Sequence, residues 1–331
     1  MSGEDQFLKY KRSAEIAQLL EENKAYISKK QRTRLQKRGK NALINEDNEG
    51  KVTDELCPLC QSEKAVFYHY GHETDRFYYK CVKCSLIFVL RSSYLSEFEE
   101  AKRYEMHDND IKQPGYRTFL NRCVVPLHEA LKSTQEEWDN SADEELKKIS
   151  RDGMDFGCGP GPSISILMGE LGYKVVNFDP QFVPDPENPP TKPHVVPDSL
   201  ATIDTGKETP VIQSIDVLYA QPSLQRKYRF ITCTEVIEHV KDPMVVWKKL
   251  FDLVAPGGVV AMMTGVVNNE EMFKGWHYHR DPTHICFYHK DTLNYVESLF
   301  PWKMSRPDKQ VILFTKNKDV EVETPNEKEE K

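Results

Sequence analysis

Residues 154–179 read MDFGCGPGPSISILMGELGYKVVNFD. An apolar run, a turn rich in glycine, a helical pattern and a second apolar run predict a strand, a turn, a helix and a strand. Asp179 ends the second run 22 residues after Gly157, where an acid can accept hydrogen bonds from both hydroxyls of a ribose. Glycine lets the backbone approach a ligand because it has no Cβ. The stretch therefore predicts an α/β fold with a site for an adenosine-containing cofactor.

The acid before the first glycine distinguishes between cofactors. The turn reads D-x-G-x-G-x-G from Asp155 onward. A carboxylate there would repel a pyrophosphate, but it can hold the ammonium group of a methionine moiety directly or through water. This favours S-adenosylmethionine over NAD, and the alternative is a purely structural turn. The expected cofactor-binding residues are Asp155, Phe156, Gly157, Cys158, Gly159, Gly161, Asp179, Pro180, Thr234 and Glu235.

The alternation of strands and helices continues toward the C-terminus. Apolar runs predict strands near 215–219, 229–233, 259–264, 302–306 and 310–315, and helical spacing predicts helices over 242–254 and 291–299. Eight prolines between Pro180 and Pro210 predict an insertion or long loop over 180–213. On the N-terminal side, residues 92–150 read as mostly helical.

Two close cysteine pairs precede this region. Cys57 and Cys60 form one C-x2-C pair, and Cys81 and Cys84 form the other. Four thiolates at this spacing can converge on one zinc ion, and the segment between the pairs reads as a hairpin. Four cysteines leave no open position, so we expect a structural zinc ribbon; a redox role is the alternative. Such a module could also contact nucleic acid or a partner protein.

The ends of the chain are polar. A helix is predicted over 6–40, and the stretch from Lys29 to Lys40 holds seven Lys or Arg and no acid, which fits either a solvated helix end or an arm that contacts phosphates. We divide the chain into an N-terminal helix and linker (1–50), the zinc ribbon (51–91), a helical segment (92–150), the cofactor domain (151–316) and a disordered acidic tail (317–331).

The composition excludes several classes of protein. The formal net charge of −7 provides no global attraction for nucleic acid, although a local basic patch could. No run approaches the roughly 18 apolar residues that span a membrane, and the first residues do not resemble a signal peptide. We expect a cytoplasmic protein, with the nucleus as the alternative; the oligomeric state is left open.

The motifs resemble those of a known family. Residues 153–265 are similar to class I S-adenosylmethionine-dependent methyltransferases through DFGCGPG (155–161), NFDP (177–180), ITCTEVIEHVKDP (231–243) and APGG (255–258). The resemblance extends to a group of bacterial zinc-ribbon methyltransferases through CPLC (57–60), HDNDIKQPGYRTFL (107–120) and RDPTHICFY (280–288). It implies a seven-stranded Rossmann-like sheet in the order 3-2-1-4-5-7-6, with strand 7 antiparallel.

A second metal site is one interpretation of the segment after 234. On a helix, Glu235, Glu238 and His239 would share one face, and they could bind Mg²⁺ or another divalent ion. The set resembles the E-x-x-E-H element of small-RNA 2′-O-methyltransferases and ubiquinone-pathway O-methyltransferases, which makes His284 the expected fourth ligand or a general base. The alternative is that Glu235, the other catalytic candidate, lines the cofactor pocket and His239 packs.

The acceptor of the methyl group is less well defined. The zinc ribbon, the basic helix and the aromatic segment 276–281 favour an oxygen or nitrogen acceptor on RNA or a nucleotide. A small phenol or quinol is the alternative, and a non-catalytic zinc-ribbon scaffold or binding protein on a methyltransferase fold is another. A polar cluster at His107, Asp108, Asn109 and Asp110 could close over the site or could cap a helix.

Overall fold

The computed structural model describes residues 55–104, 110–161, 163–180, 182 and 224–319. These form two compact units. The smaller contains 55–95, Glu238–Met244 and Val266–Leu293, and the larger contains Ser96–Ile237, Val245–Gly265 and the chain from Asn294. The chain passes between the units several times, so the units differ from the linear division expected from the sequence. The N-terminal helix, most of the proline-rich segment and most of the acidic tail lie outside the described residues.

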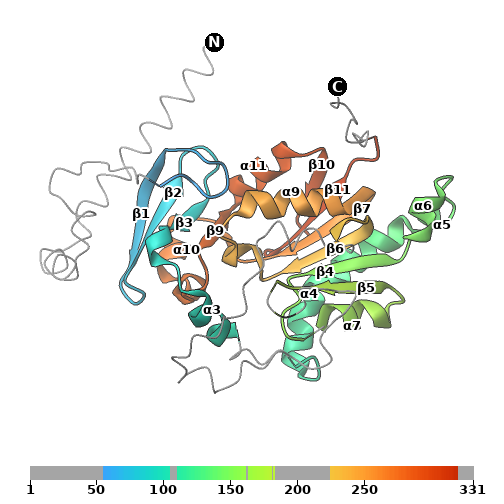
Figure 1. Cartoon of the computed structure of the whole chain (residues 1–331), viewed down its shortest axis with the longest axis horizontal. Helices are drawn as coiled ribbons and strands as arrows, with labels where there is room; N and C mark the ends of the chain where they lie inside the picture. The colour runs from blue at the N-terminus through green and yellow to red at the C-terminus, as the bar shows by residue number, and fades with distance from the viewer. Residues whose placement is uncertain (1–54, 105–109, 162, 181, 183–223, 320–331) are drawn as a thin grey trace, which may run out of the picture. The chain divides into compact units, whose positions relative to one another are not determined.

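A six-stranded sheet forms the centre of the larger unit, in the order β10-β11-β7-β6-β4-β5 (Figure 1). Strands β4, β5, β6 and β7 are parallel, and β11 is antiparallel to both of its neighbours. This confirms the predicted order apart from one edge strand, because the strand expected at 215–219 lies outside the described residues. The bounds are β4 (Asp152–Phe156), β5 (Lys174–Phe178), β6 (Tyr228–Thr234), β7 (Val254–Met263), β10 (Trp302–Ser305) and β11 (Val311–Lys316).

Helices cover both faces of this sheet. Helices α4 (Pro114–Ser133) and α7 (Ser163–Glu170) bury Leu127 and Leu167 against Phe230 and Val259 on one face. On the other face, α9 (Pro243–Leu253) places Trp247 against Phe314, with ring centroids 5.3 Å apart. Because neighbouring residues of a strand point to opposite faces, the near-continuous apolar runs of β6, β7 and β11 serve both layers.

The segment predicted as helical contains four helices among its described residues: α3 (Glu97–Tyr104), α4, α5 (Gln135–Asp139) and α6 (Glu144–Lys148). Buried Arg229 on β6 donates to the carbonyl oxygens of Leu131 and Ser150. These bonds tie the helices to the start of β4.

The end of α9 differs from the sequence prediction. Strand β7 begins at Val254 and contains the APGG segment, which was expected to precede the strand. Gly257 has a φ of +75°, and the pairing of β7 with β6 shifts register between Tyr228 and Phe230. The periodicity of apolar residues does not predict a register shift of this kind. Helix α11 (Lys290–Leu299) confirms the last predicted helix.

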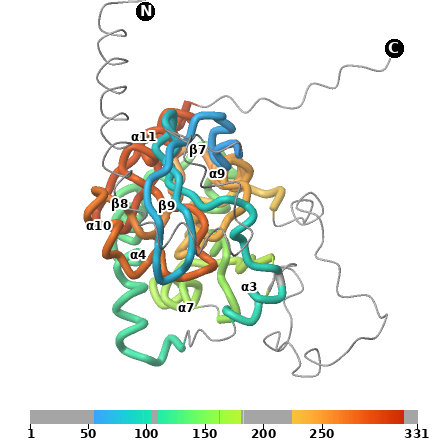
Figure 2. Tube along the Cα trace, turned by 90° about the vertical axis from the view of Figure 1, so that its left-hand side faces the viewer, coloured from blue at the N-terminus to red at the C-terminus, as the bar shows by residue number. Residues whose placement is uncertain are grey.

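The smaller unit is built on a five-stranded sheet in the order β1-β2-β3-β9-β8. Strands β1 (Ala65–Gly71) and β2 (Arg76–Cys81) form the predicted antiparallel hairpin. Strand β3 (Ile87–Val89) pairs with β9 (Cys286–His289), and β9 pairs with β8 (Val266–Val267) (Figure 2). The cysteine-rich segment therefore shares its sheet with a much later part of the chain.

Short helices complete the smaller unit: η2 (Arg91–Ser93), η5 (Ile237–His239), α10 (Glu270–Gly275) and η6 (His277–Arg280). Its core is aromatic. Tyr78 lies 5.2 Å from Phe273 and 5.6 Å from Phe287, measured between ring centroids.

Candidate functional site

The glycine turn after β4 has the backbone that only glycine adopts easily. Gly157 and Gly159 have φ values of +79° and +65°, in the left-handed region. A Cβ on Gly157 would lie 2.4 Å from Val236 Cγ2, whereas a Cβ on Gly159 would meet no atom of the described residues within 4 Å. Gly157 is therefore required by packing as well as by backbone geometry, while Gly159 borders open space.

Asp179 lies directly beside this turn. Its Oδ2 accepts a hydrogen bond from the Gly159 N–H at 3.0 Å, and its Oδ1 accepts one from the Phe182 N–H at 3.2 Å. The N–H groups of Gly157 and Cys158 donate to the Phe178 carbonyl at 2.7 and 3.1 Å. The two ends of the sequence pattern thus meet at the carboxyl ends of β4 and β5, where open α/β sheets bind their ligands.

Asp155 is the buried acid of the turn. It is 3% exposed, and its Oδ1 accepts from the Thr232 hydroxyl at 2.7 Å. Burial raises the pKa of Asp155 to about 7, the charge of Asp179 adds to the rise, and the Thr232 bond opposes it. A ligand cation beside this carboxyl would therefore favour its ionised form.

Tyr116 on α4 was not among the residues predicted from the sequence. Burial raises the pKa of Tyr116, a hydrogen bond with Ser163 opposes the rise, and the charges of Asp155 and Glu235 add to it. The phenol thus lies within electrostatic range of both acids. The PGYRTFL motif (114–120), which contains Tyr116, is the sequence feature from which this residue could have been predicted.

Thr234 and Glu235 end β6. The Glu235 N–H donates to the Met263 carbonyl at 2.8 Å, and Glu235 has a φ of 52°. The helix expected through Glu235 is wrong, because this left-handed residue precedes a single 3-10 turn, η5, over Ile237–His239. Glu235 therefore shares no helical face with Glu238 and His239. The other predicted cofactor residues, Phe156, Gly161 and Pro180, lie in the same turn or at the ends of β4 and β5.

The four cysteines of the ribbon converge. The Sγ atoms of Cys57 and Cys84 are 3.5 Å apart, as are those of Cys60 and Cys81, and all four sulfurs lie within 4.8 Å of one another. Tetrahedral Zn–S bonds of about 2.3 Å place sulfurs roughly 3.8 Å apart. The donor set fits a closed zinc site, which these residues would hold.

A second group of donors lies in the same unit. One ligand atom each of Glu238, His239 and His284 lies within 4.8 Å of the others. Glu238 is fully buried and His284 is 9% exposed. Burial lowers the pKa of His284 to about 4, and neighbouring His239 adds to the effect. At physiological pH the His284 ring is therefore neutral, the form that binds metals or accepts a proton.

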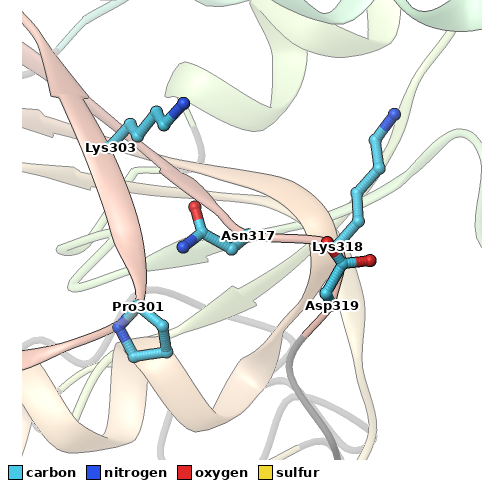
Figure 3. Close-up of a pocket in the computed structure, with 5 residues that line it drawn as sticks. All are labelled: Pro301, Lys303, Asn317, Lys318 and Asp319. Atoms are coloured by element: carbon cyan, nitrogen blue, oxygen red, sulfur yellow. The ribbon is translucent and has the colours of Figure 1, made fainter.

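The remaining polar residues predicted for the site either make hydrogen bonds within the protein or lie outside the described residues. His279 is 4% exposed, and its carbonyl accepts from the Tyr78 hydroxyl at 2.8 Å. Asp110 Oδ1 accepts from the Lys112 N–H, whereas His107, Asp108 and Asn109 lie outside the described residues. A separate open hollow at the ends of β10 and β11 contains none of the predicted site residues (Figure 3). It is lined by Pro301, Lys303, Asn317, Lys318 and Asp319.

A match to a protein family shows which kind of protein has this fold and this glycine turn. The family described as a methyltransferase domain matches residues 128–296, just over half of the chain. The chain belongs to the S-adenosylmethionine-dependent methyltransferases. This confirms the enzyme class expected from the motifs.

Curated relatives match a shorter part of this methyltransferase. The ubiquinone biosynthesis O-methyltransferase of Aliivibrio fischeri (strain MJ11) is 30% identical over 111 residues, which is 34% of this chain and 42% of that protein. The enzyme of the same name from Yersinia pestis (strain Pestoides F) is 31% identical over 111 residues, 34% of this chain and 41% of that protein. The methyltransferase thus spans less than half of the length of these relatives.

Solved structures resemble it distantly. An O-methyltransferase family protein from Burkholderia thailandensis has a TM-score of 0.36 and 10% identity, covering 70% of this chain and 66% of that one. A SAM-dependent methyltransferase from Archaeoglobus fulgidus has a TM-score of 0.30 and 14% identity, covering 57% and 74%. These scores are too low to carry an argument. Within the described ranges, no helix is long and apolar enough to cross a membrane.

Proposed function

We propose that this methyltransferase transfers a methyl group to a hydroxyl oxygen of a small phenol- or quinol-like acceptor. The observation that carries the cofactor half of the proposal is the 3.0 Å bond between the Gly159 N–H and Asp179, which joins the glycine turn to the acid of the next strand. The acceptor half is supported by the name of the curated relatives, which are ubiquinone biosynthesis O-methyltransferases.

Each residue around the turn has a proposed role toward S-adenosylmethionine. Asp179 accepts from the ribose hydroxyls, and Asp155 faces the ammonium of the methionine moiety. The open space beside Gly159 receives the ligand, and Phe156, Cys158, Gly161, Pro180, Thr234 and Glu235 line it. When bound, the cofactor supplies a methyl carbon already activated by its sulfonium, so the protein contributes mainly position and a proton acceptor.

The four-cysteine group is proposed to hold a structural zinc ion. Buried Cys57, Cys81 and Cys84 occupy the end of a sheet whose strands are short, and a zinc site supplies folding free energy in such a unit. Because β3 follows the second cysteine pair and pairs with β9, we expect zinc to stabilise the β9 region as well.

RNA or a nucleotide is the second candidate acceptor. The cysteine group supports it, because zinc ribbons often contact nucleic acid, and so does the basic stretch from Lys29 to Lys40, which lies outside the described residues. The cytoplasmic location and the nucleic-acid partner stay predictions.

The acceptor class is tested with S-adenosylmethionine that carries a labelled methyl group. Cell extract is separated into small-molecule, RNA and protein fractions, and each is incubated with wild type, with Asp179→Ala or with Asp242→Ala. Asp242 is a half-exposed acid that is not among the residues proposed to bind the cofactor, and it serves as the matched control. We expect label in small molecules with wild type and Asp242→Ala only. Label confined to RNA would replace the proposal by the second candidate, and label in none of the fractions would refute both.

A further inference from the structure

We propose that Glu238, His239 and His284 form a second metal site, which takes a divalent transition ion such as Zn²⁺, Fe²⁺ or Mn²⁺ in preference to Mg²⁺. The donors come from two segments of the smaller unit, η5 and the loop before β9. The Ile285 N–H donates to the Glu238 carbonyl at 2.9 Å, which brings His284 beside η5. The set differs from the one expected from the sequence, since Glu235 is not part of it.

Backbone carbonyls determine which nitrogen of each imidazole is available. His284 Nδ1 lies 2.7 Å from the Tyr278 carbonyl oxygen, and His239 Nδ1 lies 3.2 Å from the Thr283 carbonyl oxygen. A carbonyl oxygen can only accept, so each Nδ1 carries a proton, and Nε2 is the nitrogen of each ring that can coordinate an ion. Protein metal sites commonly orient their histidines in this way.

The carboxylate is held in the matching position. Glu238 Oε1 lies 3.9 Å from His239 Nε2 and accepts a hydrogen bond from the Tyr278 hydroxyl. Glu238 is fully buried, and a buried carboxylate requires compensating positive charge or several hydrogen bonds. A divalent ion between the three donors would provide that charge. Tetrahedral ligands at bond lengths of about 2.1 Å lie roughly 3.4 Å apart, so the 3.9 Å between Glu238 Oε1 and His239 Nε2 has to close by only about 0.5 Å.

The hairpin holds the loop that carries His284. The Arg76 guanidinium, on a residue that is 5% exposed, donates to the carbonyl oxygens of Pro282 at 2.8 Å, of Asp281 at 3.2 Å and of His284. Bonds from one planar group to three carbonyl groups of the same loop restrict its motion. Arg76 is therefore a positioning residue for the proposed site.

The ligand types indicate the class of ion. Two imidazoles and one carboxylate suit zinc, iron and manganese, whereas Mg²⁺ prefers oxygen ligands and retains its waters. Three protein ligands also leave coordination positions open. That an acceptor oxygen occupies one of them rests on the proposed function, but binding of the ion does not.

The competing interpretation is a hydrogen-bonded cluster without an ion, in which His239 and Tyr278 satisfy Glu238. Metal analysis of the full-length protein distinguishes the two. After exposure to Zn²⁺ and gel filtration, we expect about two ions per wild-type chain, one at the cysteines and one at this cluster. His284→Ala and Glu238→Gln should retain about one. His277→Ala, which removes an exposed imidazole from the same segment, should retain both.

A second measurement begins with the wild-type protein, so its main result does not depend on how the variants fold. Co²⁺ is titrated into zinc-loaded wild type from which only the weaker site has been emptied by a mild chelator. We expect visible d–d absorption that saturates at about one equivalent and is unaffected by excess Mg²⁺. Tyr278→Phe should weaken Co²⁺ binding by about 10- to 100-fold, because Glu238 loses its donor. A single zinc per wild-type chain with no saturable Co²⁺ spectrum would overturn the proposal; no acceptor is present, so this result is separate from failure of the acceptor proposal.

Discussion

Alanine at the two left-handed glycines should separate stability from cofactor binding. At Gly159 the obstacle is the φ of +65°, because a Cβ would meet no atom within 4 Å in the part of the chain that the structure describes. A left-handed alanine costs about 1 kcal/mol, so Gly159→Ala should lower the free energy of unfolding by about that amount. At Gly157 the Cβ would also lie 2.4 and 2.8 Å from the two Cγ atoms of Val236. Overpacking adds about 1–3 kcal/mol, for a total of about 2–4 kcal/mol.

Cofactor binding should follow the opposite order. The added methyl group of Gly159→Ala projects into the open space beside Asp179, which the cofactor is proposed to fill. We expect the folded variant to lose at least about 100-fold in affinity, equivalent to about 2.7 kcal/mol. Gly157→Ala acts on the packing behind the turn and should bind more weakly mainly through its lower stability. Chemical denaturation of the ligand-free proteins and calorimetry with S-adenosylmethionine measure the two effects at one temperature.

Gly115→Ala is the matched control. Gly115 lies in the first turn of α4, where an added methyl group would meet no described atom within 4 Å, so alanine should leave binding unchanged and should stabilise by up to about 1 kcal/mol. Wild-type affinity of Gly159→Ala for S-adenosylmethionine would show that the space beside Asp179 is not the cofactor site. A Gly157→Ala variant no less stable than Gly159→Ala would contradict the steric cost assigned to the contact with Val236.

Three further predictions concern charge and metal. Asp179→Ala should lower affinity for S-adenosylmethionine by about 100-fold or more in calorimetry, because it removes an acceptor of charge-assisted hydrogen bonds; unchanged affinity would contradict its assignment. The raised pKa of Asp155, about 7, should weaken binding about tenfold per pH unit below 7. In the ligand-free protein the same shift contributes stability that is present below the ordinary pKa and is lost as the pH rises toward 7, so Asp155→Asn should flatten both profiles. After a mild chelator has emptied the weaker site, chelation that strips the cysteine site should release one further zinc and destabilise the smaller unit by several kcal/mol, seen as loss of near-ultraviolet circular dichroism; an unchanged spectrum would exclude a structural role for zinc.

Local patterns in the sequence were sufficient for the cofactor turn and the cysteine site. The strand, turn, helix and strand over 154–179 lie where the apolar runs and glycines predict, and Asp179 meets the turn as expected. These features depend on residues close together in the chain, whose side-chain spacing specifies the backbone directly. The same holds for the β1–β2 hairpin, which brings the second cysteine pair back to the first.

Glu235 is a residue whose conformation the local spacing of residues predicts wrongly. Helical spacing placed it with Glu238 and His239, but its left-handed backbone ends β6 instead. The pairing of β6 with β7, which the bond from the Glu235 N–H to the Met263 carbonyl extends, competes with the helix and prevails at this residue. The helical spacing of side chains does not show that a single residue adopts a left-handed backbone and so prevents a helix from forming through it.

The amino-acid sequence by itself thus determined the class of fold, the cofactor turn and the four sulfur ligands. Only the tertiary structure decided that β3 pairs with β9, that Arg76 holds the loop at 281–284, and that His284 lies with Glu238 and His239. The physical reason is separation along the chain. Contacts between distant segments depend on which faces pack and which polar groups must find partners, and a local pattern of residues does not encode that choice.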